Sequence, residues 1–225
     1  IDQHQIEKVK MSGFEAGSEL VKYFEMLPDD SVLKQLYRRM VSMTNHGEKK
    51  KAEGYLRSQI KPGSIDVKIM TKTDRENYHK DGNLIKDGSD AVSALRGYTK
   101  SNLQNSSVVF SAGMNPRLFN YLGGCREFDV NEDGGFTKKV ILKVSDHRSA
   151  IIQGKYLAQK GIWVSEFRIE SGLNCGGHAF ATEGHLMGPI LEEFKLRKPE
   201  LIETLFEIYN TALQKKTNKK FVYPH

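Results

Sequence analysis

The chain has 225 residues, of which 38% are hydrophobic and 28% charged, a composition typical of a globular protein with a substantial core. No apolar run is long enough to cross a bilayer, which argues against a membrane protein. The net charge of +6 permits binding to anionic ligands without establishing it. The lysine clusters at residues 49–51 and 215–220 are not interleaved with aromatic residues, so we expect no nucleic-acid partner. Two cysteines are too few for a disulfide scaffold and favour a reducing, cytoplasmic location.

Residues 1–60 are predicted to be mainly helical, forming a separate segment or a lid over the rest of the chain. Residues 18–26 and 32–41 each carry apolar side chains at helical spacing, with a Pro-Asp-Asp stop between them. Residues 47–54 are predicted to be a lysine-rich connector. The turn signal Pro62-Gly63 follows, and we place the domain boundary after residue 60.

Residues 61–225 alternate between strand and helix patterns, which predicts an α/β domain. The expected strands are 65–70, 107–112, 140–145 and 163–171. The expected helices are 91–100, capped by Asp90, then 117–122, 148–159, 186–194 and a last helix that begins at Pro199. This alternation predicts parallel strands with right-handed crossovers, in either a doubly wound sheet or a (β/α)8 barrel.

Charged residues within the strands favour the barrel. Lys143 lies between two apolar residues, and Glu166, Arg168 and Glu170 share one face of their strand. Charges on an otherwise buried strand require a polar interior or a ligand, which the mouth of a barrel provides. Four strands do not close a barrel, so we expect only part of one.

In both architectures the functional site lies at the carboxyl ends of the strands. There the sequence has Thr71-Lys72, residues 113–115, residues 145–147 and the loop Asn174-Cys175-Gly176-Gly177-His178. Two adjacent glycines let the backbone approach a ligand closely, and a histidine exchanges protons near neutral pH. We therefore expect the loop at residues 174–178 to be the centre of the site.

Residues 170–178, with the sequence ESGLNCGGH, resemble the strand-end loop of the FMN-dependent nitronate monooxygenases, which are TIM barrels. They are also similar to that loop in related flavin-containing enoyl reductases. The segments IDVKIM, SVVFSAG and VILKVS resemble the second, third and fourth strands of the family, so the resemblance covers roughly residues 60–195. It implies an FMN-dependent oxidoreductase that acts on a small carbon acid or an enoyl-type substrate. His178 would be the catalytic base, and Gly176 and Gly177 would approach the flavin.

The same resemblance implies further contacts at the strand ends. The cofactor contacts are assigned to Lys143, Ser111, Gly113 and Lys68, and the substrate contacts to Glu170, Asn174 and Asn115. A lysine at position 143 would stabilise negative charge on a reduced flavin. The alternative is that Lys143, Glu170 and Arg168 form ion pairs with a purely structural role.

Three departures from the family pattern affect the expectation. Lys68 stands where the family has an asparagine in its second strand. Residues 1–60 contain no match to the first strand, and the phosphate-binding loops of strands seven and eight would lie beyond residue 225. We therefore expect the chain to be a piece of a longer protein, with FMN affinity weakened accordingly.

Other functions remain open from sequence. One is a different FMN barrel, such as the glutamate synthase domain, although its glycine-rich loop lacks the histidine. Another is a non-catalytic binding or assembly fragment that uses its basic surface. Catalysis by Cys175 is disfavoured because a nucleophile and its base usually come from separate elements. Residues 129–134 begin like an EF-hand loop, but Val140 replaces the required bidentate acid, so no metal is expected.

Overall fold

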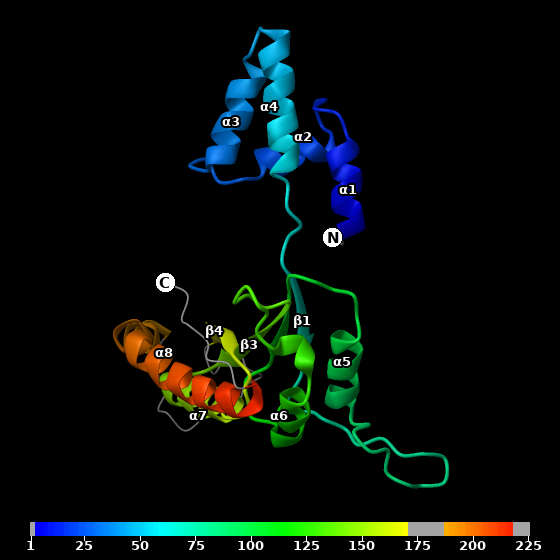
Figure 1. The fold of residues 1–225 in the computed structure, drawn as a ribbon, viewed down its shortest axis with the longest axis vertical. Coiled ribbons are helices and arrows are strands. Elements are labelled where there is room, and N and C mark those ends of the chain that lie inside the picture. The colour runs from blue at the N-terminus through cyan, green and yellow to red at the C-terminus, as the bar shows by residue number, and fades with distance from the viewer. Residues whose placement is uncertain (1–2, 171–186, 218–225) are drawn as a thin grey trace. The chain divides into compact units, whose positions relative to one another are not determined.

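The computed structural model describes residues 3–170 and 187–217, and the chain divides into two compact units, Ile1–Gly63 (unit 1) and Ser64–His225 (unit 2). The sequence had placed this boundary after residue 60. Figure 1 shows that unit 1 is made of helices and that unit 2 contains the sheet. Each unit has its own hydrophobic core.

Unit 1 consists of the helices α1 (Gln3–Met11), α2 (Glu19–Glu25), α3 (Val32–Val41) and α4 (His46–Ser58). The connector predicted at residues 47–54 was wrong, because these residues belong to α4. The side chain of Asn45 accepts hydrogen bonds from the Gly47 and Glu48 amides and so caps this helix. Lysine, alanine and glutamate are good helix formers, and the two glycines cost only about 1 kcal/mol each.

The core of unit 1 is centred on Phe24, which is fully buried. Its ring stacks on Tyr37 with centroids 5.5 Å apart and on Phe14 at 5.9 Å. Arg57 of α4 donates a hydrogen bond of 2.6 Å to the Ser12 carbonyl and lies over the Phe14 ring. These contacts tie the last helix to the loop between α1 and α2.

Unit 2 is built on a four-stranded parallel sheet, as the alternating pattern predicted. The strands are β1 (Ile65–Ile69), β2 (Ser106–Phe110), β3 (Lys138–Val144) and β4 (Val164–Ile169). They are ordered β1-β2-β3-β4, so within the described residues the strand order follows the chain without reversal. The helices are α5 (Asp90–Thr99), α6 (Pro116–Gly123), α7 (His147–Ala158) and α8 (Met187–Thr217), with a 3-10 turn at Arg126–Phe128.

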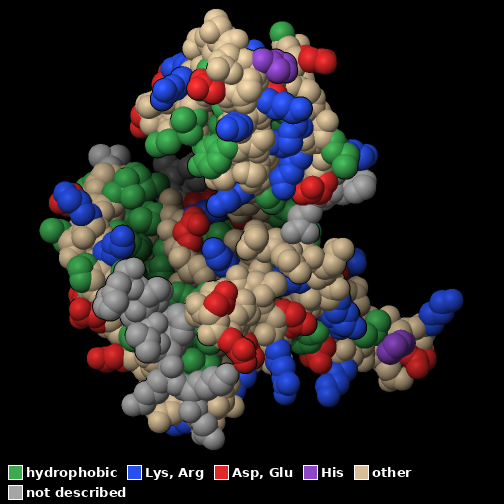
Figure 2. All heavy atoms as spheres, turned by 45° about the horizontal axis from the view of Figure 1, so that its top comes forward, with side chains coloured by type: hydrophobic (Ala, Val, Ile, Leu, Met, Phe, Trp, Pro, Cys, Tyr) green, Lys and Arg blue, Asp and Glu red, His purple; other side chains and the backbone are tan. Residues whose placement is uncertain are grey.

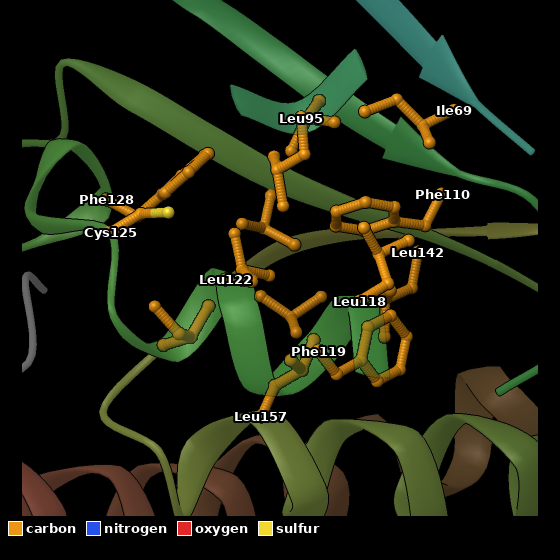
Figure 3. Close-up of a cluster of buried hydrophobic side chains, with 14 of the residues drawn as sticks. Ile69, Leu95, Phe110, Leu118, Phe119, Leu122, Cys125, Phe128, Leu142 and Leu157 are labelled. Carbon is orange, nitrogen blue, oxygen red and sulfur yellow. The ribbon is translucent and has the colours of Figure 1, made fainter. Parts of the chain in front are cut away.

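The main hydrophobic core of unit 2 lies between one face of the sheet and its helices. Figure 3 shows Ile69, Phe110 and Leu142, from three neighbouring strands, beside Leu118 and Leu122 of α6. Side chains of α5, α7 and α8 belong to the same buried cluster. Because alternate residues of a strand point to opposite faces, the strand residues that do not point toward these helices lie on the other face of the sheet.

Two predictions about helices in unit 2 were wrong. Residues 186–194 and the helix expected to begin at Pro199 form one helix, α8, with Pro199 inside it. An internal proline costs about 3 kcal/mol, but the buried Phe194, Leu201 and Leu205 continue one apolar stripe across it. Helix α5 starts at Asp90 rather than being capped by it, and the Asp74 carboxylate accepts a 2.9 Å bond from the Ala91 amide.

We call the face of the sheet away from the helices the polar face, defined by Asp66, Lys68, Lys139, Lys143, Glu166 and Arg168. The strand register places these residues on one side of the sheet. Lys143 of β3 is in register with Arg168 of β4, and Lys139 of β3 is in register with Ser107 of β2, which is in register with Asp66 of β1. Between them lie Val109 and Ile141, each 3% exposed. The predicted common face of Glu166 and Arg168 is confirmed, and the register adds Asp66 and Lys139, which sequence analysis had not singled out.

One ion pair on the polar face joins the two edge strands of the sheet. Nη2 of Arg168 on β4 lies 2.8 Å from Oδ2 of Asp66 on β1, at the opposite edge of the sheet. Three strand spacings amount to about 14 Å in a flat sheet. Two side chains standing upright on a flat sheet at that separation would not meet, so the sheet departs from a plane, by the twist of an open sheet, by curvature toward a barrel, or by both.

One lysine of β3 points to the helices instead. Lys138 is 3% exposed, and its Nζ donates hydrogen bonds to the carbonyls of Tyr98 at 2.6 Å, Thr99 at 2.8 Å and Ser101 at 2.8 Å. The last carbonyl groups of a helix have no amide partner further along it, and Lys138 bonds three carbonyls at the end of α5, of which that of Tyr98 also accepts from Ser101. The buried ammonium group therefore joins β3 to the carboxyl end of α5.

Candidate functional site

The carboxyl ends of β1 and β2 are joined by a polar network. The Thr71 amide donates to Ser111 Oγ at 2.8 Å, and Thr71 Oγ1 donates to the Ser111 carbonyl at 3.0 Å. Thr71 is 4% exposed, so this pairing satisfies a buried hydroxyl. Ser111, predicted to contact the cofactor, thus lies at the expected strand end, but its hydroxyl already serves Thr71.

Asn115 organises the next part of the same strand ends. Its Nδ2 donates to the Thr71 carbonyl at 3.2 Å and to Asp74 Oδ2 at 3.1 Å, while its Oδ1 accepts from the Leu118 amide and caps α6. Both amide hydrogens of this predicted substrate contact are therefore used inside the protein. Burial raises the pKa of Asp74, but the bonds from Ala91 and Asn115 outweigh it and hold that pKa below its usual value.

Gly113 has a backbone conformation that favours glycine and lies close to the side chain of Lys72. Its φ is +118°, a conformation closed to other residues, and a Cβ at this position would lie 3.0 Å from Cε of Lys72. Gly113 and Ser145 also line a cavity of about 220 Å³ at the ends of β2 and β3. The predicted backbone contact therefore lies beside a cavity at the expected end of the sheet.

Lys143 and Glu170 form an ion pair at the carboxyl end of the polar face. Their side chains are 15% and 22% exposed, so the pair is largely shielded from solvent. The structure thus brings together a predicted cofactor contact and a predicted substrate contact, and their charges compensate each other. Lys68, a third predicted contact, is exposed on β1 of the same face and in register with Val109 of β2.

Arg168 continues this charged surface toward β1. Its Nε lies 2.5 Å from Oε1 of Glu166, and its Nη2 bonds Asp66. The guanidinium group holds the pKa of Asp66 below its usual value despite partial burial, and the two carboxylates raise the pKa of Arg168. Sequence reasoning had paired Arg168 within its own neighbourhood and missed Asp66, because the contact depends on the curvature of the sheet.

The end of β3 carries Ser145, Asp146 and His147. Asp146 caps α7 by accepting a 2.6 Å bond from the Ser149 amide, and Ser145 Oγ donates to its other oxygen at 2.8 Å. His147 is 1% exposed, packs edge-on against Phe194 and has Nδ1 3.9 Å from Oε1 of Glu193. Within residues 3–170 and 187–217, neither ring nitrogen has a hydrogen-bond partner. This histidine faces α8 and not the polar face.

The predicted centre of the site lies outside the described residues. Asn174, Cys175, Gly176, Gly177 and His178 all fall within residues 171–186. The structure describes the predicted strand-end residues Thr71, Gly113, Lys143 and Glu170, and the role of His178 stays a prediction.

Cys125 is a free, buried thiol on the helix side of the sheet. Burial raises its pKa to about 11, and its Sγ donates a 3.4 Å bond to the Tyr121 carbonyl. A thiol with such a pKa is not ionised near neutral pH, which argues against a nucleophilic role.

The comparisons with known proteins assign the chain to no family. No protein-family model, curated protein or solved structure matches the chain. Among the helices of the described part, none combines the length and the apolar character that crossing a bilayer requires.

Proposed function

We propose that unit 2 is part of an FMN-dependent oxidoreductase of the nitronate monooxygenase type, built on a (β/α)8 barrel. Its substrate would be a small carbon acid or an enoyl-type compound bound at the carboxyl ends of the strands. The observation that carries the proposal is the ion pair between Arg168 and Asp66. It supports a curved sheet with a charged inner face, as in a barrel interior, rather than a flat sheet covered on both sides.

The stagger of this ion pair adds support for the barrel. Asp66 is in register with Ser107 and Lys139, whereas Arg168 is in register with Lys143, four residues further along β3. In a barrel the strands tilt by about 40°, so residues at one height belong to later positions on each successive strand. A contact from β1 to a later row of β4 is what this tilt predicts.

The charges at the strand ends fit a flavin ring. Lys143 lies on the polar face, close to the end of β3, and an ammonium group there stabilises the negative charge of a reduced flavin. Glu170 balances that charge and holds the lysine in place. Gly113, at the end of β2, supplies backbone that a planar ring can approach, whereas the cavity beside it is lined by residues of α7 and lies on the helix side of the sheet.

The proposed chemistry divides between the cofactor and the protein. FMN, when bound, supplies the electron transfer. His178 takes the proton from the substrate carbon, which requires an imidazole that is neutral at the working pH. Lys143 stabilises negative charge, and the pairs Thr71–Ser111 and Asp74–Asn115 keep the strand ends rigid around the site.

The alternative function, a non-catalytic binding or assembly fragment, requires a surface that attracts anionic polymers. On the face of unit 2 seen in Figure 2, acidic and basic side chains are interspersed, and no continuous basic area covers it. One lysine, Lys138, is buried and contributes nothing to the surface. We therefore propose the oxidoreductase in preference to the assembly fragment.

The flavin site is tested by titrating FMN and following the quenching of its fluorescence. The double variant Lys143→Met, Glu170→Gln removes the ion pair without leaving an unpaired buried charge. We expect it to weaken FMN binding by about tenfold or more, the usual effect of losing a contact to a charged group. Lys139→Met is the matched control, since Lys139 lies on the same face of β3 at its other end.

Two results would count against the site. One is an FMN affinity that the double variant leaves unchanged or that Lys139→Met reduces equally. The other is the absence of any saturable quenching by the unmodified protein. Replacing His178 with alanine should lower turnover of a nitronate far more than FMN binding, and an equal loss of both would refute its role as the base.

A further inference from the structure

The opposite end of the sheet contains a cavity that the proposed reaction does not use. It is open to solvent, has a volume of about 590 Å³, and is formed by residues that precede β2, β3 and β4 together with the first residues of β3 and β4. Its lining includes Asn105 before β2, Asn131 and Asp133 before β3, and Trp163 before β4. The flavin site is proposed at the carboxyl ends of the strands, so this cavity is a separate place on the molecule.

The lining has an unusual chemical balance. Among the described residues that line it, the apolar side chains are the aromatic rings of Trp163 and Phe136, and none is aliphatic. The others are amides, hydroxyls, one carboxylate and one ammonium group, the last from Lys139. Such a surface offers both donors and acceptors in several directions around an aromatic wall.

The indole of Trp163 is packed against two aromatic rings of α8. Trp163 packs against Phe206 of α8 with centroids 6.1 Å apart and an interplanar angle of 88°, and against Tyr209 at 5.4 Å. The indole is partly exposed, and it lines the cavity at the point where β4 begins. A fixed, partly exposed indole is a stacking platform that loses little entropy on binding.

The polar wall is a tight turn with fixed geometry. Val130 and Phe136 form an antiparallel bridge, and the Asn131 amide donates to the Gly135 carbonyl at 2.8 Å. Oδ1 of Asp133 accepts from the Gly135 amide at 3.0 Å, which orients the carboxylate and leaves Oδ2 for a ligand. The bonds between Asn131 and Thr137 are long, at 3.3 and 3.4 Å, so these side chains retain bonding capacity.

We propose that this cavity binds a neutral saccharide. A sugar ring presents C–H groups on one face, which stack on an indole, and hydroxyl groups around its edge, which pair with amides and carboxylates. A nucleobase also stacks on indole, but it offers fewer hydrogen-bonding groups than Asn105, Asn131, Asp133 and Thr137 provide together. The single ammonium of Lys139, with Asp133 in the same lining, does not make a site for a phosphate.

The protein carries its own reporter for this proposal, because Trp163 is the only tryptophan in the chain. Its fluorescence should change saturably when the intact protein is titrated with glucose, galactose, N-acetylglucosamine, maltose and cellobiose. We expect at least one of these sugars to give a saturable change at millimolar concentration. Trp163→Phe, followed by calorimetry, should weaken binding of that sugar while keeping the packing against α8.

The double variant Asn131→Ala, Asp133→Ala should weaken the response by about tenfold, as expected for lost hydrogen bonds. Asn83→Ala is its matched control, since Asn83 belongs to a similar turn closed by the bridge between Tyr78 and Leu84. Three outcomes would overturn the proposal: no saturable change with any sugar, a change that the double variant leaves intact, or saturation by adenosine alone.

Discussion

Replacing Lys138 with methionine should strongly destabilise unit 2. The ammonium group donates to three carbonyls at the end of α5 and lies 4.8 Å from the centre of the Tyr98 ring. Methionine has a similar length but no donor, so the variant leaves the three carbonyls without this partner in a site that is 3% exposed. The loss is therefore a loss of bonds and not of volume.

The magnitude follows from two opposing contributions. Three bonds from a charged donor contribute about 1.5 kcal/mol each, or about 4.5 kcal/mol together. Burial lowers the pKa of Lys138, which means that holding the charged form inside the protein has a cost. Taking that cost as about 1–2 kcal/mol, we expect the free energy of unfolding to fall by about 3 kcal/mol.

Urea denaturation followed by the fluorescence of Trp163 measures this change in unit 2. With a typical slope of about 2 kcal/mol per molar urea, the midpoint should fall by about 1.5 M. Lys139→Met is the control. Lys139 is the exposed neighbour of Lys138 on the polar face, so replacing it should change the free energy of unfolding by no more than about 0.5 kcal/mol. A loss below about 1 kcal/mol for Lys138→Met, or equal losses for both variants, would refute the reasoning.

Three further predictions concern the fold around the sites. Gly113→Ala should destabilise unit 2 by about 1–3 kcal/mol because of its positive φ. Gly97→Ala, in the last turn of α5 where an added Cβ meets nothing, should stabilise it by up to about 1 kcal/mol in the same assay. The pKa of Cys125 is raised to about 11 from 9.0, so the folded protein holds this proton more tightly than the unfolded chain. Between pH 9 and 11 the free energy of unfolding of the unmodified protein should therefore fall by about 2 kcal/mol relative to that of Cys125→Ala. Parallel profiles of stability against pH for the two proteins would contradict this. Pro199→Ala should restore an amide donor within α8 and raise the melting temperature, and a fall would show that the proline is required.

Local signals in the sequence were sufficient for most elements of unit 2. The strands are short apolar runs that alternate with helical patterns, and Asp146 and Asn115 cap α7 and α6 through side-chain bonds within three residues. Pro199 misled the prediction because its local preference is to begin a helix, whereas the apolar stripe of α8 continues through it. The lysine-rich start of α4 was wrongly predicted to be a connector because the prediction relied on its charge, although lysine is a good helix former.

The candidate site was predictable only in part. The sequence correctly grouped Ser111, Gly113, Lys143 and Glu170 at one end of the sheet, because parallel strands bring their carboxyl ends together. It did not anticipate that Asn115 and Ser111 would use their polar groups on Thr71, since that depends on the distance between two loops. The buried position of Lys138 was missed because a lysine at the start of a strand is usually exposed.

The ion pair between Arg168 and Asp66 also has a consequence for how unit 2 folds. Each strand pairs with its neighbour in sequence, so the sheet can grow one strand at a time through contacts that are closer in sequence than the Arg168–Asp66 pair. The Arg168–Asp66 bond joins residues that are 102 positions apart, and it can form only when all four strands are in place. It therefore belongs to the late part of folding, and salt that screens it should accelerate unfolding while leaving the rate of folding almost unchanged.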